Sequence, residues 1–309
     1  MGALAVLILG SAGWVITQSP SALSAEELAA IYDEPAPTPG APLHVYHLGH
    51  SLVGRDMPAM LAQMAGHTYA SQLGWGTPLR AHWEPDEPIN GFDTENAHDK
   101  YMDAKAALDS GAFDTFVLTE MLEIEAAIEF FEAPEYLEKW ATKARAGNPN
   151  TRVYLYESWH ALDDPNGWLQ RLDTDPARYW EGVLLAQAMA GERDPDPIYV
   201  IPAGRVMAEF VRRLEAGTGV DGVTSREDLF ARLDDGSLDP AHVNDLGAYL
   251  VALTHYAVLY HRSPLGLPAQ LDRADGTAAT APGPQLAQLM QETVWDVVSA
   301  LPVTGIPQD

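Results

Sequence analysis

Residues 43–64 decide the fold and read LHVYHLGHSLVGRDMPAMLAQM. Residues 43–48 form a short apolar run of strand length, and residues 57–64 carry apolar side chains at helical spacing. This stretch therefore predicts a strand that leads, through a few polar residues, into a helix. Those polar residues follow the carboxyl end of the strand.

The same order of strand and helix recurs along the rest of the chain. Further strands are expected at residues 115–119, 152–157 and 198–202, and further helices at residues 136–145, 178–190, 206–214, 244–261 and 285–301. This alternation predicts the α/β fold class, with a mostly parallel sheet covered by helices on both faces. Because ligands of such folds bind at the carboxyl ends of the strands, chemically active residues are expected directly after strands. Residues 86–103 are expected to form a long polar loop or lid, and residues 274–283 a surface loop.

The composition narrows the class of protein. The 309-residue chain combines a hydrophobic content of 47% with a formal net charge of −26. That hydrophobic content is ordinary for a globular protein with a sizeable core. The negative charge favours solubility and repels phosphate backbones and anionic membrane surfaces, so no nucleic-acid partner is expected. The sequence contains no cysteine, which excludes disulfides, thiolate nucleophiles and cysteine-ligated zinc.

The N-terminal residues carry a targeting pattern. Residues 3–16 are apolar and uncharged, and this length of roughly 14 residues suits a signal-peptide core better than a membrane span of about 20. With the small residues that follow, residues 1–25 predict a signal peptide or an N-terminal anchor, and hence an exported protein, periplasmic or secreted. Residues 26–42 include four prolines and predict a linker. Residues 43–309 are expected to form one folded domain.

Ser51 is the candidate nucleophile, because it follows the first predicted strand directly. Near the start of the next helix it would lie among free backbone N–H groups, which can stabilise an oxyanion during acyl transfer. Val53 stands where a Gly-x-Ser-x-Gly elbow would have its second glycine. The alternative is that Ser51 only caps the helix.

Asp239 and His242 are the candidate acid and base. They belong to Asp239-Pro240-Ala241-His242, a turn expected to enter the helix at residues 244–261. The three-residue spacing lets both side chains project from one loop, where the carboxylate can orient the imidazole and stabilise its protonated form. The alternative is a turn in which Asp239 caps the helix and His242 is exposed.

The two segments together resemble the SGNH/GDSL hydrolase superfamily, over about residues 43–262. The resemblance rests on Gly-His-Ser-Leu after the first strand and on Asp-x-x-His before a late helix. It implies a three-layer, flavodoxin-like α/β/α sandwich and a carboxylic ester hydrolase that needs no cofactor and no metal. It also implies that Ser51 is the nucleophile, His242 the base and Asp239 its orienting acid.

The family's oxyanion hole has a partial counterpart here. Gly76, with Gly74 as the alternate, matches the glycine that supplies a backbone N–H in the family's second block. The third block departs from the family, because Thr119 and Glu120 stand where Gly-x-Asn-Asp is usual. Thr119 could replace the missing asparagine as a donor, or backbone N–H groups could suffice. Glu120 could instead hold a substrate hydroxyl.

Aromatic and acidic residues near the strand ends indicate the substrate. Trp83, Glu157, Trp159 and His160, with Glu120, are candidates for substrate binding, since aromatic rings stack on sugars whose hydroxyls need acceptors. The expected partner is a small-molecule or glycan ester. The alternative for Trp83 and Trp159 is that both are packing residues.

Three rival functions stay open at this stage. His44, His47 and His50, with Asp56 nearby, could suggest a metal site, but His44 and His47 would point to opposite faces of a strand. The altered third block also fits a non-catalytic carbohydrate-binding or scaffold protein on the same fold. An O-acyltransferase would use the same three residues as an esterase.

Overall fold

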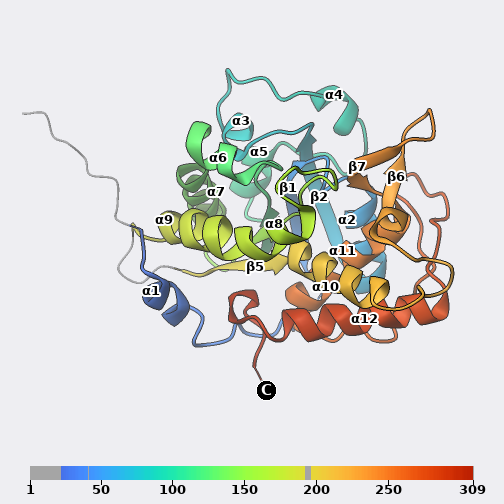
Figure 1. The fold of residues 1–309 in the computed structure, drawn as a ribbon. Helices are drawn as coiled ribbons and strands as arrows, with labels where there is room; N and C mark the ends of the chain where they lie inside the picture. The colour runs from blue at the N-terminus through green and yellow to red at the C-terminus, as the bar shows by residue number, and fades with distance from the viewer. Residues whose placement is uncertain (1–21, 41, 192–195, 309) are drawn as a thin grey trace, which may run out of the picture.

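A five-stranded, all-parallel sheet forms the centre of the molecule in the computed structural model, which describes residues 22–40, 42–191 and 196–308. Its strands are β1 (His44–His50), β2 (Thr68–Gly74), β3 (Thr115–Leu118), β4 (Arg152–Glu157) and β5 (Ile198–Pro202). They lie in the order β2-β1-β3-β4-β5, which is the flavodoxin-like order. The predicted α/β/α sandwich is therefore confirmed (Figure 1).

Helices cover both faces of the sheet (Figure 1). On one face α2 and α11 pack together, and α10 and α12 pack onto α11. On the other face α7 packs with α3, α5 and α9. The bounds of these helices are α2 (Asp56–Ala65), α3 (Leu79–Trp83), α5 (Ala104–Asp109), α7 (Ala133–Gly147), α9 (Ala186–Ala188), α10 (Ala203–Glu215), α11 (Asp245–Tyr260) and α12 (Pro284–Val298).

The remaining elements border this sandwich. They are α1 (Ala25–Ala30), α4 (Phe92–Glu95), α6 (Ile124–Phe130), α8 (Trp168–Asp175), the π-helical segment η1 (Pro176–Leu185), two short 3-10 helices η2 (Arg226–Leu229) and η3 (Pro302–Thr304), and the hairpin strands β6 (Phe230–Arg232) and β7 (Leu238–Val243). The long loop expected at residues 86–103 contains α4. Residues 178–190 form η1 and α9 rather than one regular helix.

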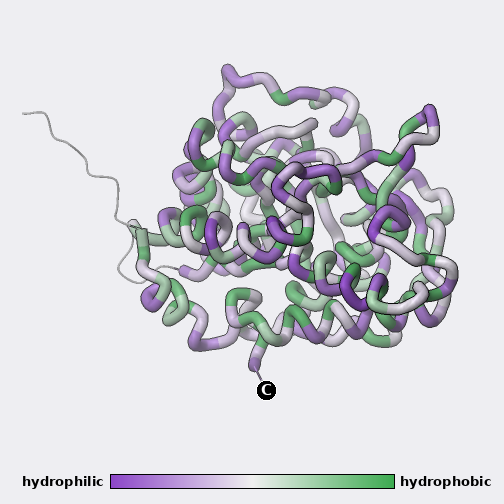
Figure 2. Tube along the Cα trace, viewed as in Figure 1, coloured by the Kyte–Doolittle hydropathy of each residue, from purple (hydrophilic) through white to green (hydrophobic). Residues whose placement is uncertain are grey.

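The strands are apolar because both faces of the sheet are covered. All residues of β3 and β5 are buried, and so are all but the first residue of β1 and of β4. The covering helices are amphipathic, and Figure 2 shows hydrophobic and hydrophilic residues alternating along the helices at the bottom of the molecule, where α12 lies.

Strand β2 was not predicted from the sequence. It is the edge strand of the sheet and pairs only with β1 among the described strands. Its sequence, TYASQLG, is exposed or half-buried over the first three residues, so it lacks the apolar run by which the inner strands are recognised.

Gly49 is required by packing at the end of β1. A Cβ at this position would lie 2.6 Å from Thr119 Cγ2 and 3.0 Å from Val53 Cγ2, so any side chain here would force β1 away from the residue that follows β3. Gly49 lies within the strand, so its role is this close packing and not a turn.

The segment expected to be a linker is folded onto the domain. Within residues 26–42, Tyr32 is buried and its hydroxyl donates to the Ile198 carbonyl at 2.7 Å, and Ala36 N–H donates to the Gly305 carbonyl at 2.8 Å. The linker prediction was therefore wrong. Residues 1–21, most of the predicted signal peptide or anchor, lie outside the described residues. Within the part of the chain that the structure describes, no helix is both long and apolar enough to span a membrane.

Candidate active site

Ser51, His242 and Asp239 form one chain of hydrogen bonds at the carboxyl edge of the sheet. With the imidazole proton on Nδ1, the Ser51 hydroxyl donates to His242 Nε2 at 2.9 Å, and His242 Nδ1–H donates to Asp239 Oδ2 at 2.9 Å. The structure thus brings together the three residues that the sequence singled out, across a separation of 191 positions between Ser51 and His242. This order of hydroxyl, imidazole and carboxylate is the arrangement of a serine nucleophile, its base and its orienting acid.

The carboxylate of Asp239 is held in place by three donors. Its Oδ1 accepts from the backbone N–H groups of Ala241 and His242, both at 3.0 Å, and its Oδ2 accepts from the His242 ring. Burial by itself would raise the pKa of Asp239, but the hydrogen bonds outweigh it and hold the pKa below its usual value. The group is therefore ionised at neutral pH and can stabilise an imidazolium.

The Asp239–His242 segment is a strand and not the loop that the sequence predicted. It belongs to β7, which pairs antiparallel with β6 through an irregular register. Two hydrogen bonds from the segment that follows β4 hold the backbone of β7 in place. Trp159 Nε1–H donates to the Ala241 carbonyl and Leu162 N–H donates to the Pro240 carbonyl, both at 2.8 Å.

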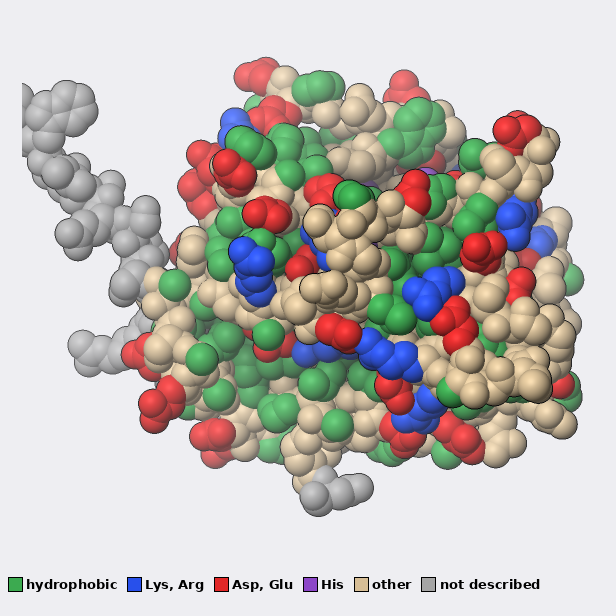
Figure 3. All heavy atoms as spheres, viewed as in Figure 1, with side chains coloured by type: hydrophobic (Ala, Val, Ile, Leu, Met, Phe, Trp, Pro, Cys, Tyr) green, Lys and Arg blue, Asp and Glu red, His purple; other side chains and the backbone are tan. Residues whose placement is uncertain are grey.

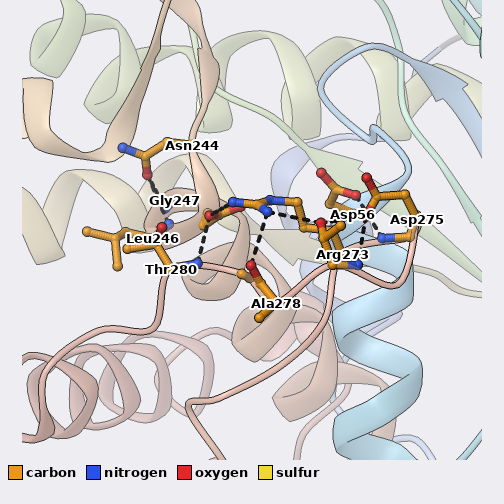
Figure 4. Close-up of polar contacts among 12 residues, drawn as sticks. Asp56, Asn244, Leu246, Gly247, Arg273, Asp275, Ala278 and Thr280 are labelled. Carbon is orange, nitrogen blue, oxygen red and sulfur yellow. Dashed lines mark hydrogen bonds and ion pairs between the residues drawn. The ribbon is translucent and has the colours of Figure 1, made fainter.

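Asn244 connects this hairpin to α11. Its Oδ1 accepts from the N–H groups of Leu246 and Gly247, and so caps the helix (Figure 4). Its Nδ2 donates to the carbonyls of Asp228 and Phe230. Figure 4 also shows Arg273 reaching across from the following loop, and it forms two bonds to Asp245 at 2.6 and 2.8 Å. Thr280 N–H also donates to Asp245 Oδ2 at 2.8 Å, which ties the loop at residues 274–283 to the start of α11.

Ser51 lies in a turn and not at a helix terminus, since α2 begins at Asp56. Among the described residues, neither the Ser51 N–H nor the Gly76 N–H donates to an acceptor in a turn or loop or to a side chain. Gly76 lines the same cavity as Ser51 and has a positive φ of 55°. Both N–H groups are therefore candidate oxyanion donors.

The other two oxyanion candidates have structural roles. Gly74 ends β2, and a Cβ there would lie 2.3 Å from both Ile89 and Thr77 atoms, so this glycine serves close packing. Thr119 is fully buried, and its hydroxyl donates to the Tyr156 carbonyl at 2.7 Å. The prediction that Thr119 supplies the missing donor was wrong, because its single proton is already used.

Glu120 is buried beneath the site and does not face substrate. Its Oε1 accepts from Met121 N–H at 2.7 Å and from Leu79 N–H at 3.2 Å, and the residue has no exposed surface. Burial raises the pKa of the Glu120 carboxyl to about 7, although both hydrogen bonds act in the opposite direction. The prediction that Glu120 holds a substrate hydroxyl was therefore wrong.

Glu157 and His160 are also used inside the protein. Glu157 is buried, its Oε1 accepts from the Arg205 N–H and its Oε2 lies 2.7 Å from Arg205 Nη2. His160 is buried, with Nε2 3.0 Å from Asp175 Oδ2. These contacts inside the protein leave neither side chain available to substrate, which corrects the predicted substrate-binding role of both.

The two predicted tryptophans have packing roles. The Trp83 ring stands edge-on to the Trp140 ring, with the two ring centroids 4.9 Å apart. Lys105 Nζ lies 4.6 Å from the centroid of the Trp83 ring. Trp159 is 1% exposed, and it anchors β7 through the bond to Ala241. The packing alternative is therefore the one that the structure supports for both.

Two cavities meet at Ser51 and His242. The smaller, of about 230 Å³, is lined by Arg55, Asn244 and Trp159, and the larger, of about 550 Å³, by Trp75, Gly76, Glu95 and Leu122. Trp75 and Glu95 were not predicted as site residues. Trp75 lies between Gly74 and Gly76, the two glycines considered for the oxyanion hole. This position in the sequence could have indicated that Trp75 lies close to the site.

The histidines near β1 do not form a metal site. His44 is exposed, whereas His47 and His50 are buried, and His50 Nε2 bonds to the Glu120 carbonyl at 2.8 Å. The ligand-type cluster found among the described residues is Glu123, His160 and Asp164. Arg171 Nη1 donates to both of its carboxylates, at 3.0 and 2.6 Å, so a guanidinium already supplies the positive charge there.

Comparisons with known proteins add little to this geometry. No protein-family model and no curated protein matches the chain. One solved structure with some similarity is the salicylyl-acyltransferase SsfX3 from a tetracycline biosynthetic pathway, with 16% sequence identity, a TM-score of 0.35, and coverage of 70% of this chain and 53% of that one. This chain thus spans about half the length of that protein. The fold and the site define an α/β/α protein with a hydrogen-bonded serine, histidine and aspartate at the carboxyl edge of its sheet.

Proposed function

We propose that this protein is a serine hydrolase of the SGNH/GDSL type that cleaves a carboxylic O-acyl ester. The observation that carries the proposal is the continuous hydrogen-bonded chain from Ser51 through His242 to Asp239. The resemblance of the two motif segments to that superfamily, and the flavodoxin-like strand order, support it. The expected substrate is a small-molecule or glycan ester, and export of the protein stays a prediction from the sequence.

The proposed mechanism has two halves. His242 Nε2 takes the Ser51 proton while Oγ attacks the ester carbonyl, and the N–H groups of Ser51 and Gly76 hold the oxyanion. The protonated His242, stabilised by Asp239, then gives its proton to the leaving alcohol as the ester C–O bond breaks. Water, deprotonated by His242, attacks the acyl-enzyme and releases the carboxylic acid, with Ser51 regaining its proton. A hydroxyl acceptor in place of water would give acyl transfer by the same steps.

Labelling with a fluorophosphonate tests the nucleophile. We expect the wild-type protein to be labelled on Ser51, and labelling to disappear in Ser51→Ala and in His242→Ala, with hydrolysis of simple acetyl esters falling by at least about 10³-fold. Ser263→Ala is the matched control and should be labelled like the wild type, since its hydroxyl only accepts a 3.4 Å bond from Leu265 N–H. A folded wild type that takes no label, or a Ser51→Ala variant that still does, would refute the assignment.

A further inference from the structure

Trp75 exposes an aromatic surface beside the nucleophile. It is 50% exposed, although exposing so large an apolar side chain is unfavourable. It lines the 550 Å³ cavity together with Ser51 and His242. An indole at this place is available to a ligand whose ester lies at Ser51.

The Trp75 side chain is held in one orientation. Its Nε1–H donates to Glu95 Oε1 at 2.7 Å, and its backbone N–H donates to the Asn90 carbonyl at 2.7 Å. Gly91 lies against the ring, because a Cβ there would be 2.2–2.7 Å from three indole atoms, and its φ of 67° favours glycine as well. A ring fixed in this way loses little conformational entropy when a ligand stacks on it.

Glu95 adds an acceptor at the rim of this ring. Its Oε1 takes the Trp75 N–H, whereas its Oε2 receives no hydrogen bond from any of the described residues. Glu95 lines the same cavity, and neither lysine nor arginine is among the described residues that do. Figure 3 shows acidic side chains spread over the whole visible face of the molecule. An anionic ligand is therefore disfavoured, and a neutral ligand with hydroxyl donors is favoured.

We propose that Trp75 and Glu95 form the subsite for a neutral sugar ring whose acylated hydroxyl is presented to Ser51. A pyranose has an apolar C–H face that can stack on the indole, and hydroxyls that can donate to Glu95 Oε2. An aromatic acyl group would use the ring but not the carboxylate. This inference deepens the proposed esterase function and rests on it for the position of the ester.

Binding can be measured without hydrolysis in the Ser51→Ala protein. With methyl β-D-glucopyranoside as the probe, saturation-transfer NMR should show the strongest signals on the C–H protons of one ring face. The signals should be lost in Ser51→Ala/Trp75→Ala and kept in Ser51→Ala/Phe130→Ala, a control that also removes an exposed ring, 64% exposed at the end of α6. Equal signals in both double variants would overturn the subsite.

Kinetics on two acetyl esters then tests the link to catalysis. For Trp75→Ala, the ratio of kcat/KM for methyl 6-O-acetyl-β-D-glucopyranoside to that for ethyl acetate, which has no ring, should fall about tenfold, equivalent to about 1.4 kcal/mol. Trp75→Phe should restore most of the ratio, and Glu95→Ala should lower it more than Glu95→Gln does.

The outcomes separate this inference from the proposed function. If the wild type hydrolyses both esters and Trp75→Ala leaves the ratio unchanged, the sugar subsite is wrong and the esterase stands. If Trp75→Ala instead impairs only hydrolysis of phenyl acetate, the subsite takes an aromatic ring and the sugar proposal is overturned. If no ester is hydrolysed but Trp75-dependent sugar binding is seen, the subsite stands and the hydrolase fails in favour of a binding protein.

Discussion

At the scale of single residues, two carboxyl groups near the site have opposite pKa shifts: the pKa of Asp239 is lowered and that of Glu120 is raised. Asp239 is ionised and hydrogen-bonded at the surface, whereas Glu120 is enclosed beneath the turn that carries Ser51. The Glu120 backbone carbonyl accepts from His50, the neighbour of the nucleophile. A raised pKa at Glu120 keeps a full negative charge away from the place where an oxyanion would form, up to about neutral pH.

Glu120→Gln should remove one pH dependence of stability. The folded state keeps the Glu120 proton up to about pH 7, whereas the unfolded chain releases it near pH 4.5, so the free energy of unfolding falls as the pH rises through this window. Relative to Glu120→Gln, the wild type should lose about 3 kcal/mol between pH 4.5 and 7. Urea unfolding of both proteins at several pH values measures this difference, and parallel curves would contradict it.

At the scale of elements, the hairpin β6–β7 determines where His242 lies. Its backbone is tied to the segment after β4 by the Trp159 and Leu162 bonds, and to the start of α11 by Asn244. The position of the base therefore depends on contacts made by its neighbours in the chain, while its own ring, the middle member of the hydrogen-bonded chain, is about half exposed.

Substitutions at Asn244 should separate helix capping from hairpin anchoring. Asn244→Ala removes both sets of bonds and should cost about 1–2 kcal/mol of stability, together with a lower kcat. Asn244→Asp keeps the cap but places a carboxylate against the Asp228 and Phe230 carbonyls, so helix stability should be better preserved than activity. Thermal unfolding measures the change in stability, and kcat for an acetyl ester measures the change in activity. If Asn244→Asp has the activity of the wild type, the bonds from Asn244 Nδ2 to the hairpin carbonyls are not needed for catalysis.

At the scale of the whole molecule, a highly acidic protein encloses several neutral histidines. His50, His82 and His255 are each buried, and burial lowers the pKa of each to about 4. His47, also buried, has neither ring nitrogen hydrogen-bonded to another described residue. These rings cannot be protonated inside the fold without a large desolvation cost.

The buried histidines should destabilise the protein in mild acid. Between pH 6.5 and 4 the unfolded chain binds protons at these rings and the folded state does not, so stability is lost as the pH falls through this window, by about 1 kcal/mol per pH unit for each ring. His255→Phe should reduce the number of protons taken up on unfolding by up to one, because this ring is neutral in the fold and takes up a proton only when it is exposed. Chemical unfolding between pH 4 and 7 gives this number, and an unchanged slope in His255→Phe would refute the prediction.

The sequence by itself determined the parallel α/β architecture and the three residues of the hydrogen-bonded chain. Apolar strand runs followed by amphipathic helices are local patterns, and Ser51, Asp239 and His242 each follow or adjoin such an element, so their positions could be read along the chain. The polar edge strand β2 carried no such pattern.

Only the tertiary structure decided which other polar and aromatic side chains face the cavity. Glu157, His160 and Thr119 find partners from distant segments and become buried, whereas Trp75 is exposed because Gly91 and Glu95 hold it at the surface beside Ser51. Whether a side chain is paired or free depends on contacts between segments far apart in sequence, and no local pattern of residues encodes those contacts.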